Sequence, residues 1–380
     1  MGGIWSSPAV GTAASSSAVP AKHQQQQRQP FHVKKVAIIG AGPAGLAAAR
    51  YLTAQGAVDS ITIFEQQDEV GGVWHYSGLA PKEVPVPQQD PFWGPEPSIW
   101  PEGAPAPIFP SPMYERLHAN IPGSLMQFHD TAFPADEWLF PKREAIQAYL
   151  VRYAEDLRHL IKFRHQVTQV NLESQDGRDQ WHLEASSTVN DDQVIRETYD
   201  AVVVANGHYS VPFIPSIKNL QEFNKAHPSI ISHSKQYRKN EHFRGKKVVV
   251  VGNGPSGLDL ALQINEVADR TLMSVRHPTS PDKISHIGCE EVPEIVEFLP
   301  DQRGVLFKDG KLGDDGKHIN EFYDWVNKAK HVGKQPPHWE GEQFWQRKLA
   351  PQAKTKFEED GCRAKTLADL GYQYEPGKEQ

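Results

Sequence analysis

The sequence predicts an α/β fold with two Rossmann-like dinucleotide-binding domains. Two observations lead to this prediction. A glycine motif of the form GxGxxG occurs twice, and each copy lies between a short apolar strand and a helix-forming segment. The chain has 380 residues, which is enough for two or three domains.

The first 32 residues are rich in Ser, Ala and Gln and include the run Gln24 to Gln27. Such a segment buries too little apolar surface to offset the entropy lost on ordering. We therefore predict a disordered tail over residues 1–32.

The first motif begins with an apolar strand from Val33 to Ile39. A helix over Leu46 to Leu52 follows, and a second strand, Ser60 to Phe64, ends at Glu65. In such a motif the first glycine makes the tight turn, the second lets the backbone approach a pyrophosphate, and the third lets helix and strand pack closely. The cofactor-binding candidates of this motif are Gly40, Ala41, Gly42, Pro43, Ala44 and Gly45.

The middle of the chain changes character twice. Residues 76–112 are crowded with proline, which excludes helix and central sheet and predicts an extended surface excursion. Residues 142–161 carry apolar side chains at helical spacing, including Tyr149 and Leu150. Three strands are then expected, at Val167–Leu172, Trp181–Ala185 and Thr198–Ala205, the last of them a buried strand.

The opening pattern is repeated later in the chain. A strand over Val248 to Val251 leads into the second motif, and a helix from Leu258 to Ala268 and a strand from Thr271 to Val275 follow. Within the turn Gly252 to Gly257, the cofactor-binding candidates are Gly252, Gly254, Pro255, Ser256 and Gly257.

The charged residue after each second strand distinguishes the two motifs. Glu65 lies 20 residues past Gly45, and Arg276 lies 19 residues past Gly257. A carboxylate accepts hydrogen bonds from ribose hydroxyls, whereas a guanidinium fits a 2′-phosphate. Either motif alone could be a glycine turn of an ordinary α/β fold. Together they predict one tightly held and one exchanging cofactor, most simply FAD and NADPH.

Composition excludes several classes of protein. The net charge of −7 argues against nucleic acid as a partner, and no apolar run approaches the roughly 20 residues of a membrane-spanning helix. We therefore expect a cytoplasmic protein, either free or on the cytosolic face of a membrane. The two cysteines, Cys289 and Cys362, exclude a CxxC redox pair, a flavin disulfide reductase and a multi-cysteine metal site, and we expect no metal.

With these motifs the sequence resembles the flavin-containing monooxygenases, especially their fungal members of the N,N-dimethylaniline monooxygenase type. Beyond the glycine motifs, Val70 to Trp74 is similar to the family's Gly-Gly-x-Trp segment, and Leu117 to Pro122 is similar to its threonine-asparagine segment, with Ala119 in place of threonine. The resemblance adds as cofactor-binding candidates Gly72, Val73, Trp74, Asn120 and Ile121.

The resemblance implies NADPH- and O₂-dependent oxygenation of nitrogen or sulfur in small molecules through a flavin hydroperoxide. It also implies a catalytic role for Asn120, whose family counterpart lies beside the flavin; a turn asparagine before Ile121-Pro122 is the structural alternative. His233 and Tyr237 match part of the family fingerprint, and we take them as linker residues near NADP. Tyr237 favours heteroatom oxygenation over ketone insertion, since the related Baeyer–Villiger enzymes usually carry Trp there.

The resemblance divides the chain into a FAD-binding domain at 33–212, an NADPH-binding domain inserted at 213–310, and a helical C-terminal segment at 311–380 that is a remnant of the FAD domain. After Asp309 the family's apolar strand is replaced by a polar, glycine-rich stretch, which indicates an internal deletion. We expect neighbouring strands to be left as open edges. Two further hypotheses follow: a catalytically incompetent nucleotide-binding chain, or an uncoupled NADPH oxidase that releases hydrogen peroxide.

Two helices are expected in this last segment. Residues 319–326 place Ile319, Phe322, Tyr323 and Val326 on one helical face, and a second helix is expected from Glu342 to Leu349, before Pro351.

Overall fold

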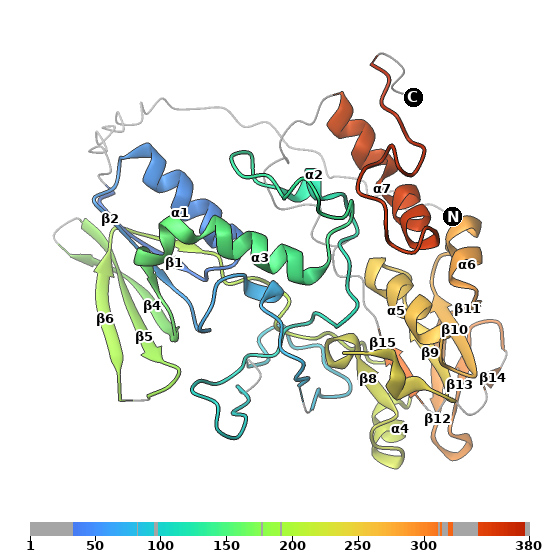
Figure 1. Ribbon diagram of the computed structural model, residues 1–380. Coiled ribbons are helices and arrows are strands. Elements are labelled where there is room, and N and C mark those ends of the chain that lie inside the picture. Colours follow the sequence, from blue (N-terminus) through green and yellow to red (C-terminus); the bar gives the residue numbers. More distant parts are fainter. Residues whose placement is uncertain are drawn as a thin grey trace, which may run out of the picture. The chain divides into compact units, whose positions relative to one another are not determined.

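The computed structural model describes residues 33–376, except 82, 95–97, 176–177, 191, 311, 314–317 and 322–340 (Figure 1). The predicted tail over residues 1–32 lies outside this part of the chain. None of the described helices combines the length and the hydropathy needed to cross a membrane.

The first glycine motif belongs to a four-stranded, all-parallel sheet. Its strands are hydrogen-bonded in the order β3-β2-β1-β7. The bounds are β1 (Lys35–Ile39), β2 (Ser60–Phe64), β3 (Ile161–Lys162) and β7 (Ala201–Val204).

Helices α1 (Pro43–Gln55) and α3 (Arg143–Tyr153) pack against one face of this sheet. Leu46 of α1 and Leu150 of α3 lie in one apolar cluster with Ile38 of β1. The predicted periodicity of residues 142–161 is therefore present, although the helix ends at Tyr153 and continues as the 3-10 helix η2 (Glu155–Leu160).

An antiparallel sheet covers the opposite face of the first sheet. Leu183 and Tyr199 of this second layer pack against Ala37 and Phe64. Its strands, in the order β4-β5-β6, are β4 (His165–Gln175), β5 (Arg178–Ser187) and β6 (Val194–Tyr199).

The single strand predicted over Thr198–Ala205 is in fact two strands in two sheets. β6 ends at Tyr199, β7 begins at Ala201, and Asp200 stands between them. The Asp200 carboxylate accepts the backbone N–H groups of Lys34 and Lys35, each at 2.8 Å. These two hydrogen bonds hold the chain where it crosses from one sheet to the other.

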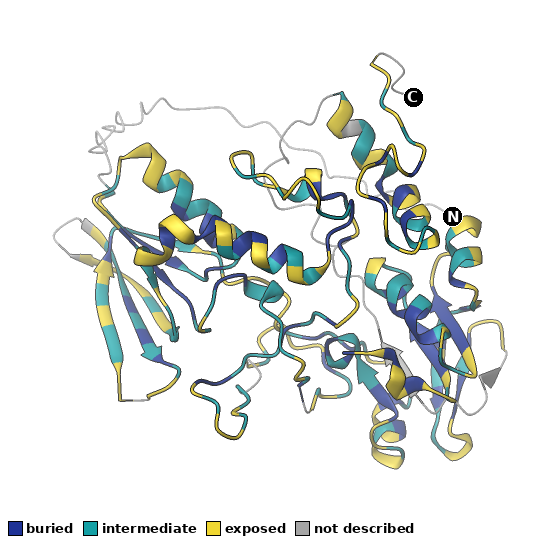
Figure 2. Ribbon diagram, viewed as in Figure 1, coloured by how far each residue is buried: buried dark blue, intermediate teal, exposed yellow. Residues whose placement is uncertain are grey.

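The second glycine motif belongs to a five-stranded, all-parallel sheet with the order β11-β10-β9-β15-β8. Figure 2 shows that its central strands β9 and β10 are among the most buried of the chain. The bounds are β8 (Ile231–His233), β9 (Lys247–Val251), β10 (Arg270–Val275), β11 (Glu290–Pro293) and β15 (His318–Glu321).

The remaining elements are short apart from α5, which follows the second motif. The helices are α2 (Gly123–Met126), α4 (Leu220–Ala226), α5 (Pro255–Asn265) and α6 (Pro281–Ile287). The 3-10 helices are η1 (Gly72–Trp74), η3 (Ser234–Gln236), η4 (Asn240–Phe243) and η5 (Pro300–Gln302). An antiparallel sheet contains β12 (Ile295–Leu299), β13 (Gly304–Phe307) and β14 (Leu312–Gly313).

The helix predicted over residues 319–326 is wrong at its start, because Ile319 lies in strand β15. Phe322, Tyr323 and Val326 lie outside the described residues. β15 pairs in parallel with β9 on one side and with β8 on the other. β15 therefore occupies the edge of β9, and backbone pairing with two neighbours overrides the polar character of the sequence His318–Glu321.

An open edge of the kind we expected lies at β7. Among the described strands, the first sheet pairs β7 with β1 alone. The sequence of Ala201–Val204 predicts a buried strand, yet Val204 is 70% exposed and the other three residues are only half-buried. The apolar side chains of β7 are therefore less buried than those of a central strand, because no described strand pairs with its outer edge.

The C-terminal helix α7 (Glu342–Glu359) is longer than the predicted Glu342–Leu349, because it continues through Pro351. Its residue Phe357 is fully buried against Phe140, and the backbone N–H of Leu139 donates to the Ala364 carbonyl. The C-terminal segment is thus packed against Leu139 and Phe140.

Candidate cofactor-binding sites

The first glycine turn leaves no room for side chains. Gly40 has a φ of 101°, and a Cβ on Gly45 would lie 1.9 Å from the Gly40 carbonyl oxygen. Helix α1 begins at Pro43 without a capping side chain within the described chain. The backbone N–H groups of its first turn and the helix dipole are therefore available to an anion, as a pyrophosphate requires.

Glu65 lies at the end of β2 beside this turn and is almost fully buried. Its carboxylate accepts the backbone N–H of Ala41 at 2.8 Å and that of Gln67 at 3.0 Å. Burial raises the pKa of Glu65, while these hydrogen bonds oppose the increase. An ionised carboxylate can accept about four hydrogen bonds, so it retains capacity for ribose hydroxyls.

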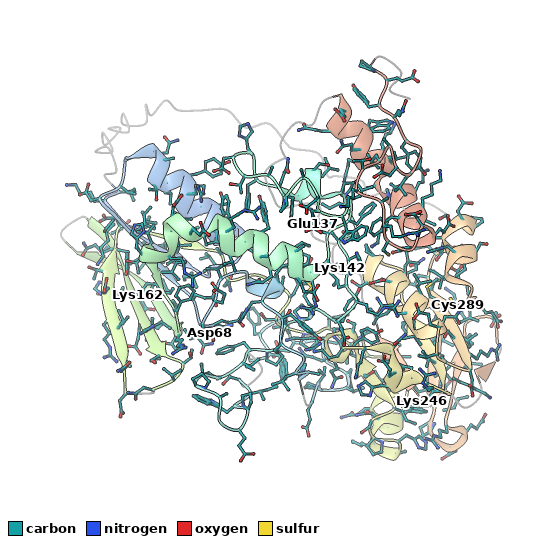
Figure 3. All side chains as sticks on the ribbon, viewed as in Figure 1. Asp68, Glu137, Lys142, Lys162, Lys246 and Cys289 are labelled. Carbon is teal, nitrogen blue, oxygen red and sulfur yellow. The ribbon has the colours of Figure 1, made fainter. Side chains whose placement is uncertain are left out.

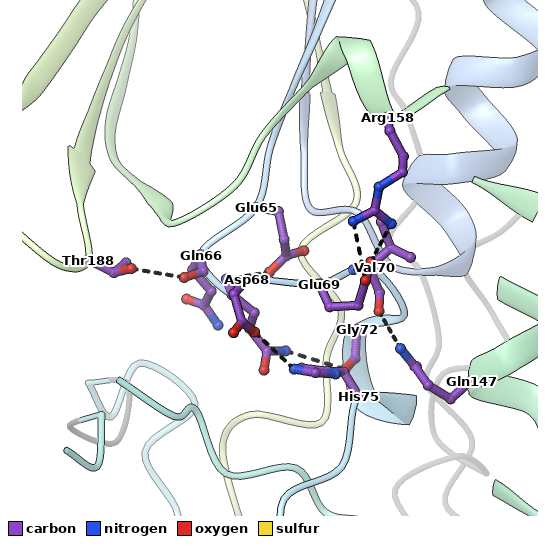
Figure 4. A network of polar contacts seen from close by, with 11 residues as sticks. Glu65, Gln66, Asp68, Glu69, Val70, Gly72, His75, Gln147, Arg158 and Thr188 are labelled. Atoms are coloured by element: carbon purple, nitrogen blue, oxygen red, sulfur yellow. Dashed lines mark hydrogen bonds and ion pairs between the residues drawn. The ribbon is translucent and has the colours of Figure 1, made fainter. Parts of the chain in front are cut away.

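The segment Val70–Trp74 contacts the first turn through its glycines, and Figure 4 shows Val70 and Gly72 within a network of polar contacts. The Gly71 N–H donates to the Ala41 carbonyl at 3.0 Å, and a Cβ on Gly72 would lie 3.1 Å from Gly42 Cα. Gln147 of α3 donates to the Val70 carbonyl at 2.8 Å. Gly72 thus lies at the glycine turn, Val73 follows it in η1, and Trp74 packs on the core of this domain.

Asn120 and Ile121 follow the buried Ala119 in a bend. The Ala119 N–H donates to the Pro141 carbonyl at 2.8 Å, and the Gly123 N–H donates to that of Leu139 at 2.9 Å. Asn120 itself is exposed, so its amide is accessible to a ligand.

The second glycine turn has the same construction. Gly252 has a φ of 102°, and its N–H donates to the Ser274 carbonyl of β10 at 2.8 Å. Gly254 precedes α5, Pro255 begins it, and no described side chain caps it. Ser256 and Gly257 form its first turn. The structure therefore places all the second-motif candidates at a helix start that fits an anion.

Arg276 directly follows β10 and is exposed. Its Nε lies 3.5 Å from a carboxylate oxygen of Glu294. Arg276, the residue predicted to bind a 2′-phosphate, thus lies at the carboxyl edge of the sheet. It is already paired with Glu294, which the sequence did not indicate as a site residue.

Tyr237 packs against the helix of the second motif. It is buried, and its hydroxyl donates to Gln263 of α5 at 3.0 Å. Gln263 in turn donates to Asp259, which also accepts the Tyr114 hydroxyl. Burial raises the pKa of both tyrosines, so they act as neutral hydrogen-bond donors.

Arg238 is a buried cation that the sequence analysis missed. The residue is only 7% exposed. It donates to five backbone carbonyls, at distances of 2.6 to 3.2 Å, which belong to Leu79, Ser111, Met113, Lys235 and Tyr237. Three of these carbonyls belong to the proline-rich excursion or directly follow it, so Arg238 ties that excursion to the segment before the second motif. Arg238 directly follows Tyr237, and nothing in the neighbouring sequence predicts that its side chain is buried.

The two cysteines have no redox geometry. Both are free thiols, and Cys289, labelled in Figure 3, directly precedes β11. Burial raises the pKa of Cys289 to about 11 and also raises that of Cys362. Both thiols are therefore protonated and unreactive at neutral pH.

The fold and the two turns define an α/β protein with two Rossmann-like halves, each with its own glycine turn. Comparison with known proteins agrees. A flavin-binding monooxygenase-like family model matches residues 110–286, and an NAD(P)-binding Rossmann-like domain model matches residues 38–87. The chain belongs to the flavin-containing monooxygenase family.

Individual relatives give the extent of this similarity. The chain is 33% identical over 289 residues to flavin-containing monooxygenase FMO GS-OX-like 9 of Arabidopsis thaliana, covering 73% of this chain and 59% of that protein. The structure of Tmm from Pelagibacter sp. strain HTCC7211 matches with a TM-score of 0.58 and 30% identity, over 76% of this chain and 60% of Tmm.

The S-allyl-L-cysteine S-oxygenase structure from Allium sativum matches with a TM-score of 0.60 and 27% identity, over 76% of this chain and 62% of that protein. The chain therefore spans about three-fifths of the length of these relatives.

Replacing Glu65 with Gln is expected to weaken FAD binding about tenfold or more, because hydrogen bonds to a charged group contribute about 1.5–3 kcal/mol. Glutamine offers one acceptor oxygen to two backbone N–H donors and must turn its NH₂ towards one of them. Flavin titration of the apoprotein measures the change. The exposed Glu155→Gln is the control, and equal affinity of the Glu65 variant and wild type would contradict a ribose-binding role.

Arg238→Lys is expected to lower the free energy of unfolding by about 2 kcal/mol or more, because an ammonium with three donors leaves at least two of the five carbonyls without the hydrogen bond that Arg238 donates. Urea denaturation measures this change. Lys239→Arg, at the exposed neighbouring position, should change stability by less than about 0.5 kcal/mol. If Arg238→Lys unfolds at the same urea concentration as wild type, the hydrogen bonds from Arg238 to these carbonyls do not contribute to stability.

His233 is expected to make the fold acid-sensitive. Its Nδ1 accepts the Lys235 N–H at 3.1 Å, and burial, with the Lys235 charge as a smaller cause, lowers its pKa to about 4. Between pH 6.5 and 4 the unfolded chain takes up a proton that the folded chain does not, so stability falls as the pH falls.

His233→Gln should lose less stability than wild type between these pH values, since glutamine accepts the same hydrogen bond without titrating. Thermal unfolding as a function of pH tests this, with the exposed His159→Gln as the control. Glu65 and Glu358, whose pKa values are raised, act in the opposite sense in every variant, so the difference between curves isolates His233. Parallel curves for His233→Gln and wild type would disprove the role.

Proposed function

We propose that this protein is an NADPH- and O₂-dependent flavoprotein monooxygenase that oxygenates nitrogen or sulfur in small molecules. One observation supports this most strongly: two glycine turns with uncapped helix starts are followed by a buried acid in one case and an exposed arginine in the other. That pair of sites fits FAD in the first half and NADPH in the second.

The substrate class is supported by the named relatives. One solved structure is of an S-allyl-L-cysteine S-oxygenase, and a curated relative with 31% identity is the trimethylamine monooxygenase of Pelagibacter sp.. A sulfide sulfur and an amine nitrogen are both soft nucleophiles. We extend that class, and neither individual substrate, to this chain.

The chain's own residues then have defined roles. The α1 start would hold the pyrophosphate of FAD, Glu65 would hold its ribose, and the Gly72–Trp74 turn would lie along it. The bound flavin would supply hydride acceptance and oxygen activation. Asn120 would offer an amide donor and acceptor there without an acidic proton. The protein's remaining task is to exclude water from the site.

The proposed domain organisation is a FAD-binding domain over 33–212 and an NADPH-binding domain from 213 that is inserted in it. β15 pairs with the second sheet, whereas α7 packs near Leu139 and Phe140. We therefore assign residues 318–321 to the NADPH-binding domain and only the segment from 341 onward to the FAD-binding domain.

The visible absorption spectrum of the purified chain tests the proposal. A flavin band that bleaches on anaerobic addition of NADPH, and product formed from trimethylamine or an alkyl cysteine on readmission of air, is the expected result. A colourless chain that takes up no added FAD would overturn it and leave the catalytically incompetent chain as the function class.

The open edge of β7 favours a second candidate, the uncoupled NADPH oxidase. This edge belongs to the sheet of the first glycine turn, and incomplete cover there would let water and protons reach the reduced cofactor. Hydrogen peroxide released per NADPH consumed separates the two: a ratio near one indicates an oxidase, and a ratio near zero with substrate present indicates an oxygenase.

Asn120→Ala is expected to abolish product formation and leave FAD binding within about twofold of wild type, because the side chain is exposed and its loss removes one polar ligand without a packing defect. Product analysis and flavin titration on the same preparation measure both effects. Asn190→Ala, a loop asparagine far along the sequence, is the control. Wild-type turnover in Asn120→Ala would refute the role.

A further inference from the structure

Arg276 has a neighbour that extends the second cofactor site. Strands β10 and β11 are paired in parallel with Val275 opposite Pro293. Arg276 directly follows β10 and Glu294 directly follows β11. The two residues therefore lie side by side at the carboxyl edge of the sheet. Their side chains form an ion pair at 3.5 Å, with Glu294 34% exposed.

A second cation reaches the same carboxylate. Lys308 follows β13, and its backbone N–H donates to the Glu294 carbonyl at 3.0 Å. Its Nζ lies 2.7 Å from the other carboxylate oxygen of Glu294. The hydrogen bond from Lys308, with the charge of Arg276 as a smaller cause, lowers the pKa of Glu294, so this carboxylate is ionised at neutral pH.

The loop that carries Arg276 is braced against the glycine turn. The Asn253 amide donates to the His277 carbonyl at 2.9 Å and to the Thr279 hydroxyl at 3.0 Å. The Thr279 N–H donates to Glu291 of β11 at 2.9 Å. The position of the cations is therefore coupled to the turn that would hold the pyrophosphate.

We propose that Lys308 is a second ligand of the NADPH 2′-phosphate, and that Glu294 occupies Arg276 and Lys308 as an internal anion until that phosphate displaces it. This inference rests on the proposed NADPH site. The two carboxylate oxygens of Glu294 each face one cation, and two oxygens of a phosphate group could face the same two cations in the same way. A phosphate monoester brings a larger charge and a third oxygen, so it outcompetes the carboxylate.

The arrangement makes Glu294 a specificity determinant. A ligand with a 2′-phosphate gains both cations and releases Glu294, whereas a ligand with a 2′-hydroxyl cannot displace a carboxylate. Removing the Glu294 charge should therefore strengthen the binding of ligands with a 2′-phosphate and leave that of ligands with a 2′-hydroxyl unchanged. Removing the Lys308 charge should weaken the binding of ligands with a 2′-phosphate and leave that of ligands with a 2′-hydroxyl unchanged.

Calorimetric titration of the full-length chain with 2′,5′-ADP and with 5′-AMP tests both statements. Glu294→Gln should bind 2′,5′-ADP about two- to fivefold more tightly than wild type, and Lys308→Met should bind it more weakly by a similar factor, as expected for exposed ion pairs. Affinity for 5′-AMP should not change in either variant. Added salt should reduce these differences.

Glu290→Gln is the matched control. Glu290 lies at the opposite end of the same strand, paired with Arg270 at 2.7 Å, and its replacement changes the net charge by the same amount. Thermal unfolding of each variant verifies that the fold is retained. Glu290→Gln should bind 2′,5′-ADP as wild type does.

Two failures can be told apart. If wild type binds 2′,5′-ADP but Glu294→Gln binds it equally or more weakly, Glu294 is no internal anion and the inference is wrong, while the NADPH site stands. Lys308→Met with unchanged affinity overturns the second ligand in the same way. If wild type binds neither NADPH nor 2′,5′-ADP, the proposed function loses its second cofactor, and the inference falls with it.

Discussion

The close approach of backbone to backbone at the first glycine turn is the constraint on which the rest of the structure depends. At the first turn, the strand end at Gly40 and the helix at Gly45 are so near that a single Cβ would lie 1.9 Å from a carbonyl oxygen. This contact aims the start of α1 over the carboxyl edge of β1 and β2. The position of Glu65, and the packing of the Gly71–Gly72 turn against Gly42, follow from it.

The same constraint explains why the sequence predicted the βαβ cores so well and other elements poorly. β2 was predicted at its observed bounds, because local apolar pattern and glycine turn agree there. Asp200, which divides one apolar run into two strands, acts through hydrogen bonds to residues more than 160 positions away. β15 is held by strands 70 to 90 positions earlier in the chain, and no local pattern announces that pairing.

The charged residues of the two sites illustrate a related difference. The spacing from the glycines located Glu65 and Arg276, since that spacing is set by one helix and one strand. It could not locate Glu294 or Lys308, because they reach Arg276 through the β10–β11 register and the β12–β13 hairpin. Arg238 was missed for the same reason: three of its five carbonyl partners reach it only through the folded excursion.

The two halves also differ in how completely they are closed, and this difference bears on the chemistry. Each half has a parallel βαβ core, an antiparallel three-stranded sheet and a returning strand, which is β7 in the first half and β15 in the second. β15 is covered by β8, whereas β7 has no described strand on its outer edge. Under the proposed function, the buried acid would serve a tightly held cofactor and the exposed cations an exchanging one, so the half that would most need to exclude water is the less completely covered. The cover of the first sheet would then bear on whether reducing equivalents end in product or in peroxide, and the charged edge of the second sheet would bear on which nucleotide delivers them.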